Sequence, residues 1–352
     1  EIDHLEKIAI DSLMTPGLQI FVSRKGKVIY NKSFGHHTYK KIVKVENEHI
    51  YDLASLTKIL AALPVVITEV DKGKLNIEDT LGRLIQEYKN SNKSNITVKE
   101  ILSHYARLVP WIPFYKETLG KTTFPKKKYY RKSPSNKFSI SVAKNLYLKS
   151  NYIKRIDKII KKSPLLDTLE YRYSDLAFFI MKKYFDKKYD KSLQELVNDR
   201  IYKPLGLKRT MYNPAKKIPV EEIVPSELDT YFRHGELRGY VHDMGAAMQS
   251  GIGGHAGLFS NASEVGVIMQ MFLKKGKYDG KILFDEKTFD LFNYCYYCDK
   301  GNRRGVGFDK PQLEGRGSTC GCVSAKSFGH MGFTGTYAWA DPEKEIVYVF
   351  LS

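Results

Sequence analysis

The first residues whose types and spacing could do chemistry are Ser55 and Lys58, in the run Ala54-Ser55-Leu56-Thr57-Lys58. Three positions apart at the start of a helix, the two side chains would share one face and reach each other. A serine hydroxyl becomes an effective nucleophile when a neighbour accepts its proton, and a lysine can be that base or stabilise the developing charge. By itself the spacing S-x-x-K is a weak signal, because it arises by chance in most chains of this size.

Two further segments could complete such a site. Tyr173-Ser174-Asp175 opens a predicted helix, and a tyrosine beside an ammonium group can be held partly as a phenolate and act as a general base. The run from Gly329 to Thr336 predicts a glycine-rich turn beside a strand, whose free N–H groups could bind an extended substrate and complete an oxyanion hole. Each segment has an ordinary alternative, since most of the 24 tyrosines must be structural and the glycines could form a plain turn.

Strand signals lie at both ends of the chain and helix signals in the middle. Residues 18–35 predict a hairpin with its turn at Lys25-Gly26-Lys27, and residues 337–340 with 346–350 predict a second hairpin. Hairpins at opposite ends of a chain commonly share one antiparallel sheet. The spacing of apolar residues predicts helices over 56–72, 98–104, 174–184, 193–202 and 262–273, the last starting near Ser263 and Glu264.

This arrangement predicts an α+β fold, with an antiparallel sheet from both chain ends flanked by helices. We expect a single domain over 1–352. Within it, residues 1–60 and 240–352 would form an α/β sub-domain and residues 61–239 a mostly helical one. A functional site would then lie at the seam between the two sub-domains.

The order and spacing of the three segments resemble the penicillin-recognising serine hydrolases, which share S-x-x-K, a middle motif and a basic-x-Gly motif. The tyrosine in the middle motif is typical of class C β-lactamases, D-Ala-D-Ala carboxypeptidases and family VIII-type esterases. Three longer runs, 50–58, 96–104 and 253–260, are also similar to segments of that family. Val241-His242-Asp243 together with residues 254–257 resembles a bacterial envelope subgroup, in which some proteins are fused to a glycoside hydrolase domain.

The resemblance implies a β-lactamase/transpeptidase-like fold and acyl transfer that uses neither a cofactor nor a metal. Ser55 would be the acylated nucleophile, and Lys58 and Tyr173 would share proton transfer. The backbone N–H groups of Ser55 and Phe333 would form the oxyanion hole. The positions implied to bind substrate are Asp175, His330, Gly332 and Thr334.

The chain departs from the family pattern at several of these positions. His330 stands where lysine is common, and near pH 7 an imidazole is neutral for much of the time, so it would hold a substrate carboxylate less firmly. Met331 lacks the usual hydroxyl, and an ionised Asp175, where asparagine is common, cannot donate a hydrogen bond although it could pair with Lys58. A helix that usually reads H-x-S-G-L reads His104-Tyr105-Ala106-Arg107-Leu108 here. These changes favour an esterase or amidase over an efficient β-lactamase.

The formal net charge is +18, and much of the excess lies between residues 116 and 190, with 20 Lys and Arg against 7 Asp and Glu. One interpretation is attraction to an anionic envelope polymer, and the other is a solvated helical surface. No nucleic-acid motif accompanies the charge, so nucleic acid is not an expected partner.

Cys295, Cys298, Cys320 and Cys322 cluster late in the chain. Disulfides or free thiols are favoured over a zinc site, because C-x-C is a poor half-site and no histidine has the usual short spacing.

Three hypotheses about function follow. The first is an active serine hydrolase on ester or amide bonds, including D-amino-acid peptide or β-lactam-like substrates, in the periplasm, secreted or anchored to the envelope. The second is a weakened or inactive module of the same fold that binds cell-wall material, and the third, least supported, is a zinc hydrolase. The chain starts at Glu1 without a signal peptide and stops after a strand-like run, so we expect processed or trimmed ends.

Overall fold

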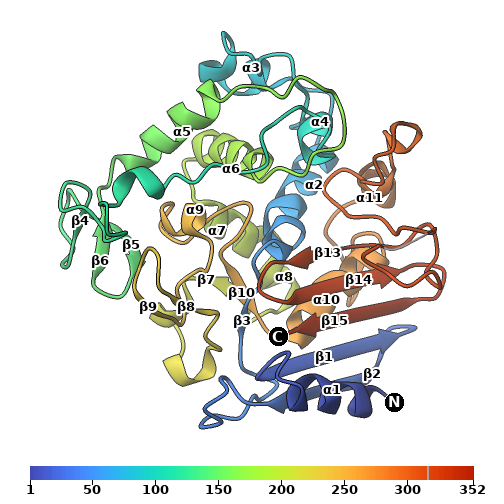
Figure 1. The fold of residues 1–352 in the computed structure, drawn as a ribbon. Coiled ribbons are helices and arrows are strands. Elements are labelled where there is room, and N and C mark those ends of the chain that lie inside the picture. Colours follow the sequence, from blue (N-terminus) through green and yellow to red (C-terminus); the bar gives the residue numbers. More distant parts are fainter. Residues whose placement is uncertain (315–316) are drawn as a thin grey trace.

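The computed structural model describes residues 1–314 and 317–352, and its main sheet is built from both ends of the chain (Figure 1). The sheet has five antiparallel strands in the order β13-β14-β15-β1-β2. Their bounds are β1 Gly17–Arg24, β2 Lys27–Gly35, β13 Phe328–Gly332, β14 Thr336–Asp341 and β15 Ile346–Leu351. Both predicted hairpins are therefore present, and β1 joins them by pairing with β15.

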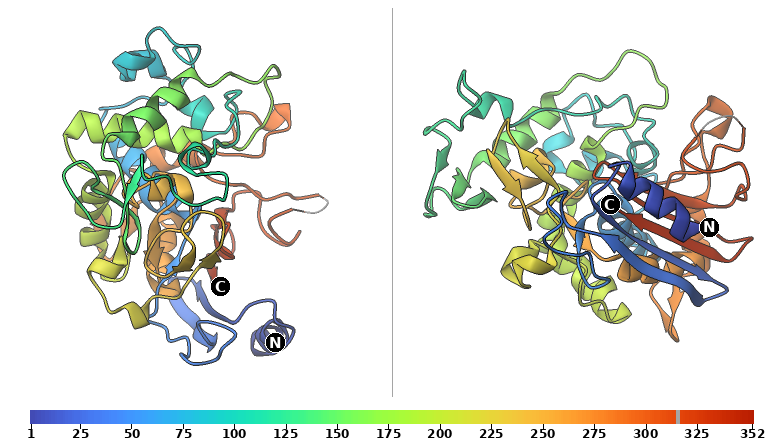
Figure 2. Two further views of the ribbon diagram at one scale, coloured as in Figure 1. Left: turned by 60° about the vertical axis from the view of Figure 1, so that its left-hand side comes forward. Right: turned by 60° about the horizontal axis from the view of Figure 1, so that its bottom comes forward.

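Side chains alternate between the two faces of this sheet, and a different helix packs on each face. On one face Phe21, Val347 and Val349 join the main core beneath α10 (Ala262–Leu273). That helix approaches so closely that a side chain on Gly266 would collide with the Phe21 ring. On the other face Leu18, Ile20 and Val22 form a smaller cluster with Ile2 of α1 (Ile2–Asp11), which lies across the strands in Figure 2.

A buried helix runs from the sheet into the helical part of the molecule. Leu56 and Thr57 begin it, a π-helical turn follows at Lys58–Ala62, and α2 continues over Leu63–Asp71. Every side chain from Ile59 to Ile67 is buried, which explains why this run is apolar on all sides. Pro64, which has no N–H to donate, follows just after the π-helical turn, where the regular hydrogen-bond pattern is already interrupted. Gly73 ends the segment at φ +64°.

The remaining elements confirm most of the predicted helices, with shifted ends. Residues 98–104 hold α4, which a Thr97–Glu100 capping box starts, and residues 193–202 hold α7 followed by a π-helical turn. Helix α10 begins one residue after Asn261, whose side chain accepts from the Glu264 N–H. The other helices are α3 Leu81–Leu84, α4 Val98–Leu102, α5 Tyr152–Lys162, α6 Leu176–Tyr189, α7 Leu193–Val197, α8 Lys203–Leu205, α9 Met244–Ala247 and α11 Glu286–Asn293.

Short strands tie the loops together outside the main sheet. One three-stranded sheet, β3-β10-β7, carries the segment that leads to Ser55. The others are β4-β6-β5, β8-β9 and β11-β12. Their bounds are β3 Tyr51–Asp52, β4 Tyr130–Arg131, β5 Ile140–Ala143, β6 Leu146–Leu148, β7 Met211–Tyr212, β8 Glu227–Asp229, β9 Gly235–Leu237, β10 Leu258–Ser260, β11 Lys277–Tyr278 and β12 Lys281–Ile282.

The four cysteines form two short-range disulfides, Cys295–Cys298 and Cys320–Cys322. This is one of the two favoured alternatives, and it leaves these thiols unable to ligate zinc together. None of the helices in the described ranges has the length and apolar character that crossing a bilayer requires.

Candidate active site

Ser55 stands on a tight turn between β3 and the buried helix. The residue before it, Ala54, has φ +44°, a conformation that L-residues adopt only at a cost. The buried carboxylate of Asp52 stabilises this turn, because it accepts from the Ala54 N–H at 2.9 Å and the His242 N–H at 2.6 Å. Sequence analysis missed Asp52, although it lies only three residues before the nucleophile.

Lys58 is fully buried beside Ser55, as the i, i+3 spacing predicts. Its Nζ lies 2.8 Å from Ser55 Oγ, 2.7 Å from Asp175 Oδ1 and 3.1 Å from the His255 carbonyl oxygen. Burial lowers the pKa of Lys58, but the Asp175 carboxylate and Tyr173 outweigh it and hold this pKa above its usual value. Lys58 is therefore protonated in the resting site, with three oxygen atoms around its ammonium group.

Tyr173 comes from the loop before α6, more than a hundred residues away from Ser55 in the chain, and its hydroxyl lies 3.1 Å from Ser55 Oγ. The loop is held by Ser174, whose hydroxyl donates to the Val109 carbonyl at 2.7 Å and whose N–H donates to His104 Nδ1 at 3.2 Å. The His104 ring also packs against Tyr173, with ring centroids 4.5 Å apart. His104 thus has a structural role, because it holds the loop that carries Tyr173.

The third segment is docked directly against the turn that carries Ser55. Thr334 Oγ1 donates to the Asp52 carbonyl at 2.7 Å, and Thr336 Oγ1 donates to the Leu53 carbonyl at 3.0 Å. A Cβ atom on Gly332 would lie 2.6 Å from the Leu53 carbonyl oxygen, so only glycine permits this approach. Thr334 is therefore committed to the backbone through its hydroxyl, although the sequence predicts it as a substrate contact.

Phe333 occupies the turn between β13 and β14, and its side chain is 84% exposed. Within the described residues, neither its N–H nor that of Ser55 donates a hydrogen bond to another group. Two free donors on segments that touch each other are what an oxyanion hole requires.

His330 is buried in β13 and its Nδ1–H donates to the Met331 carbonyl at 2.6 Å. Burial lowers its pKa well below the usual range, and the positive charges of Arg304 and Lys58 lower it further. His330 is thus neutral, and the neighbouring Met331 side chain is 47% exposed with no hydroxyl to offer. At the position where the family motif carries lysine, this site has no cation.

Asp243 and His255 form a second pair that supports the site. Both residues lie in runs that are similar to the family, and the sequence patterns assign them no role. His255 Nε2 lies 2.7 Å from Asp243 Oδ1, and the same carboxylate caps α9 by accepting from the Ala246 N–H. Burial raises the pKa of Asp243, but His255 outweighs it and holds the pKa low. The pair positions the His255 carbonyl that accepts from Lys58. Among the described residues, no cluster of three or more metal-ligating side chains is present.

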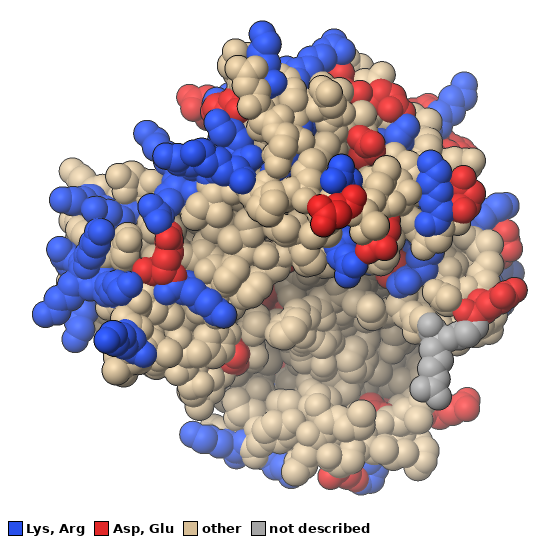
Figure 3. Space-filling view, turned by 45° about the horizontal axis from the view of Figure 1, so that its top comes forward, with Lys and Arg blue, Asp and Glu red and all other residues tan. Residues whose placement is uncertain are grey.

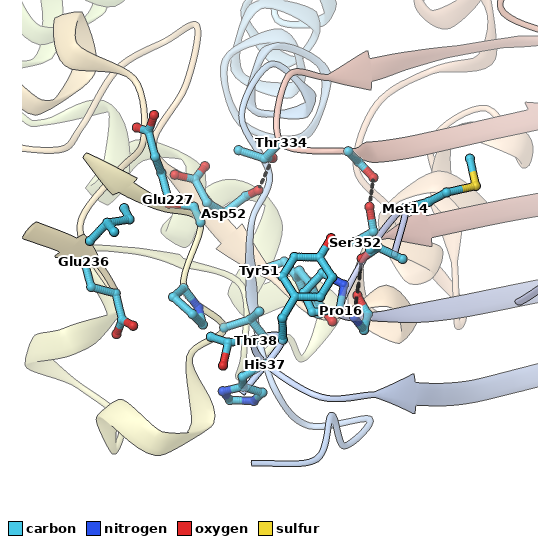
Figure 4. A pocket seen from close by; sticks show the side chains of 18 residues that line it. Met14, Pro16, His37, Thr38, Tyr51, Asp52, Glu227, Glu236, Thr334 and Ser352 are labelled. Atoms are coloured by element: carbon cyan, nitrogen blue, oxygen red, sulfur yellow. Dashed lines mark hydrogen bonds between the residues drawn. The ribbon is translucent and has the colours of Figure 1, made fainter. Parts of the chain in front are cut away.

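A pocket of about 560 Å³ lies beside the docked turn (Figure 4). Thr334 and Asp52 form one edge of it, Glu227 and Glu236 line one side, and Tyr51 lies near its centre. The Tyr51 hydroxyl is buried and has no hydrogen-bond partner within the described chain. In the space-filling view of Figure 3, uncharged side chains form most of the hollow between the upper part of the molecule and the sheet side.

Fold and site together bring S-x-x-K and a tyrosine hydroxyl around one serine, beside a turn that carries a backbone N–H free within the described residues. A family model described as Beta-lactamase matches residues 5–352. The chain belongs to the β-lactamase family, and the resemblance stated from its motifs is confirmed.

Curated relatives are similar over nearly the whole chain. The N-acetylmuramyl-L-alanine amidase of Bacillus subtilis (strain 168) is 28% identical, covering 93% of this chain and 74% of its own. A Salmonella enteritidis PT4 (strain P125109) protein, provisionally named a D-alanyl-D-alanine carboxypeptidase, is also 28% identical, covering 96% of this chain and 78% of its own.

Solved structures share the fold. EstCE1, described as a hydrolase with promiscuous acyltransferase activity, superposes with a TM-score of 0.71 at 17% identity, covering 100% of this chain and 92% of its own. The class C beta lactamase from Rhodobacter sphaeroides superposes with a TM-score of 0.66 at 12% identity, covering 99% of this chain and 92% of its own, which confirms the predicted α+β fold of the β-lactamase type.

Proposed function

We propose that this chain is a serine hydrolase that forms an acyl-enzyme on Ser55 from ester or amide substrates. The observation that carries the proposal is the convergence on one hydroxyl, since Ser55 Oγ lies 2.8 Å from Lys58 Nζ and 3.1 Å from the Tyr173 hydroxyl. The helix itself brings Ser55 and Lys58 together, but the candidate base Tyr173 comes from a distant segment, and ordinary packing does not require its hydroxyl to meet Ser55.

In the proposed reaction Tyr173, as a phenolate, accepts the Ser55 proton while Ser55 Oγ bonds to the substrate carbonyl carbon. Lys58 cannot accept that proton in the resting site, because it is already protonated beside Asp175. Its positive charge instead stabilises the phenolate. The negative charge on the carbonyl oxygen is met by the Ser55 and Phe333 N–H groups.

Collapse of this intermediate breaks the bond to the leaving group, which takes the proton from Tyr173. Water then attacks the acyl-enzyme and loses a proton to Tyr173. The bond between the acyl carbon and Ser55 Oγ breaks, Oγ takes that proton back from Tyr173, and the acid leaves. Both halves use the same groups in opposite directions, so the sequence of steps balances without a cofactor.

The substrate class is proposed from the third segment and from the relatives. Neutral His330 and the methionine after it offer little to a substrate carboxylate. This favours esters and amides whose leaving group is uncharged over β-lactams. The relatives are named for the amide bonds that they act on, in N-acetylmuramyl-L-alanine and in D-alanyl-D-alanine. Both compounds are parts of the bacterial cell wall. We therefore propose a periplasmic, secreted or envelope-anchored enzyme, for which the two disulfides are an independent argument.

The test is intact-protein mass spectrometry after incubation with a fluorophosphonate and, separately, with a fluorescent penicillin. The protein and its Ser55→Ala variant are compared, with a folding check on both. A Ser55-dependent adduct with either reagent supports the proposal, and penicillin labelling adds D-Ala-D-Ala-like substrates to it. If both folded proteins stay unmodified, the proposal fails and the binding module becomes the better hypothesis.

We also propose a contact with an anionic envelope polymer through α5 and α6. Lys and Arg side chains gather over this region in Figure 3. A pocket of about 530 Å³ between the two helices is lined by seven lysines and three acids. The acids pair with lysines of α6, as in Lys183–Asp157 at 3.1 Å, whereas four lysines of α5 are in no ion pair of the described chain: Lys154, Lys158, Lys161 and Lys162.

Co-sedimentation with purified cell-wall polymer tests this contact. We expect Lys158→Gln/Lys161→Gln to reduce binding at low salt, because exposed cations act through screened electrostatics. The matched control is Lys25→Gln/Lys27→Gln in the β1–β2 hairpin. Equal binding by both variants would contradict the contact.

A further inference from the structure

A second buried cation lies against Tyr173 on a segment that no motif includes. Arg304 is 5% exposed, and its guanidinium carbon lies 5.3 Å from the centroid of the Tyr173 ring. On the same ring, Lys58 Nζ lies 5.1 Å from the centroid. The general base of the proposed reaction is therefore in contact with two positive groups from different parts of the chain.

The contacts of Arg304 hold its guanidinium in place, but no carboxylate forms a close hydrogen-bonded ion pair with it in the described chain. Nη2 donates to the Tyr171 hydroxyl at 3.2 Å, and Nε lies 3.5 Å from Asp309 Oδ1. Within the described chain, Nε and Nη1 have no hydrogen-bond partner. Asp309 is shared, because the neighbouring Arg303 approaches it more closely, with Nε 3.2 Å from Oδ1.

The other titratable groups around Tyr173 add no positive charge, so Lys58 and Arg304 are its positive neighbours in the described chain. Asp175 pairs with Lys58, and the rings of His104 and His330 lie 4.5 Å and 5.9 Å from the Tyr173 ring. Both imidazoles are buried, and burial together with Arg304 and Lys58 lowers their pKa values well below the usual range. They are neutral and contribute no charge to the tyrosine.

We propose that Arg304 is a positioning residue that acts through Tyr173. Arg304 supplies the positive charge that a lysine at position 330 would supply in the family motif. The Arg304 guanidinium stabilises the phenolate that takes the Ser55 proton, through a short-range interaction that the burial of the arginine protects from solvent screening. This inference deepens the proposed function and depends on it, since Tyr173 must act as the base.

The experiment measures the rate of Ser55 acylation from pH 5 to 10, using p-nitrophenyl acetate turnover and fluorophosphonate labelling. Removing the charge in Arg304→Gln should make the phenolate harder to form. The acidic limb of the pH–rate profile should therefore move about one unit to higher pH, and the rate at pH 7 should fall about tenfold. Arg304→Lys, which keeps a charge, should leave the acidic limb near its original position.

Arg303→Gln is the matched control, because it removes an equivalent ion pair with Asp309 without a contact to Tyr173. If Arg304 only holds the loop through Asp309, both glutamine variants should lose similar thermal stability and keep the unmodified profile. That result would overturn the inference. A double variant, Arg304→Gln/His330→Lys, places a cation back in the motif position, and we expect it to return the acidic limb toward lower pH.

The outcomes separate this inference from the proposed function. If the unmodified protein is not acylated on Ser55, the proposed function fails and the inference fails with it. If the unmodified protein is acylated and Arg304→Gln shows the same profile, only the inference fails. Should Arg304→Gln not fold, Arg304→Lys decides, since a large move of its acidic limb despite the retained charge would contradict the proposal.

Discussion

Lys58 and Asp175 form an ion pair of 2.7 Å directly beneath the nucleophile, and the lysine side chain is completely buried. Their positions are 117 residues apart in the chain, so the pair exists only in the folded protein. It has a chemical consequence, because a buried lysine without this carboxylate would lose its proton far more easily. The pair keeps Lys58 positive, and in the proposed reaction this leaves proton transfer to Tyr173.

The first prediction concerns this pair. In Asp175→Asn the pKa of Lys58 should fall, because burial lowers it and the carboxylate that outweighs burial is gone. Activity needs the Lys58 charge and is lost as pH rises through that pKa, so the alkaline limb of the profile should move about 1 to 3 units to lower pH. Ester hydrolysis from pH 7 to 11 measures this shift, and an unmoved alkaline limb would count against the assigned role of Lys58.

The second prediction tests the base. Tyr173→Phe keeps the ring that packs on His104 and Arg304 but removes the hydroxyl 3.1 Å from Ser55 Oγ. We expect kcat for ester hydrolysis to fall about 10²- to 10⁴-fold, the usual range for loss of a general base, with little change in thermal stability.

Tyr171→Phe is the control for that variant, because the Tyr171 hydroxyl contacts Arg304 and not the nucleophile. It removes one contact of Arg304, so it should cost at most about a few-fold in kcat, far less than Tyr173→Phe. Equal losses in the two variants would show that the loop, and not the Tyr173 hydroxyl, matters for the reaction.

A third prediction follows from the docking of β13 on the nucleophile turn. The methyl group of Gly332→Ala would lie 2.6 Å from the Leu53 carbonyl and would also collide with the Thr336 hydroxyl. The strand must move away from Ser55, which should cost about 1 to 3 kcal/mol of stability and most of the acylation rate. Thermal unfolding and fluorophosphonate labelling give the two readouts.

Gly235→Ala provides the comparison, since a methyl group there would meet no atom within 4 Å. It should be nearly neutral in both assays. Normal labelling of Gly332→Ala would mean that the oxyanion donor lies elsewhere.

The fourth prediction concerns stability and pH. Burial holds the pKa of His330 well below its usual value in the folded state. Below about pH 6.5 the unfolded chain therefore binds a proton on this imidazole that the folded protein does not bind. Its contribution to stability is complete above about pH 6.5 and is lost as pH falls, by about 1.4 kcal/mol per unit. His330→Asn should remove about this much of the slope between pH 6.5 and 5.

Urea unfolding at a series of pH values measures that slope. His4→Gln, at an exposed position on α1, is the control and should leave the slope unchanged. If the His330 variant retained the full slope, the imidazole would have to be protonated in the folded protein.

Local sequence patterns predicted the elements whose form depends on near neighbours. The apolar spacing over 262–273 coincides with α10, because a helix that covers a sheet must repeat its buried side chains every three to four residues. Lys25-Gly26 forms the predicted hairpin turn, with φ values of +51° and +74°. The Ser55–Lys58 contact is local too, since the helix itself brings positions i and i+3 together.

Helix α1 and the exact ends of the helices were not predicted, because their limits depend on packing against distant strands and on caps such as Asn261. Asp52 was missed for a similar reason. A carboxylate at the end of a short strand has no distinctive local signal, and its role depends on the Ala54 and His242 amides that the fold places around it.

The sequence by itself determined the family, the strands at both chain ends and the order of the three segments around Ser55. Only the tertiary structure decided the charges in the site: that Lys58 is held positive by Asp175, that His330 is neutral, and that Arg304 reaches Tyr173 from outside every motif. The physical reason is that protonation depends on burial and on charges close in space, and neither is encoded in the spacing of residues along the chain.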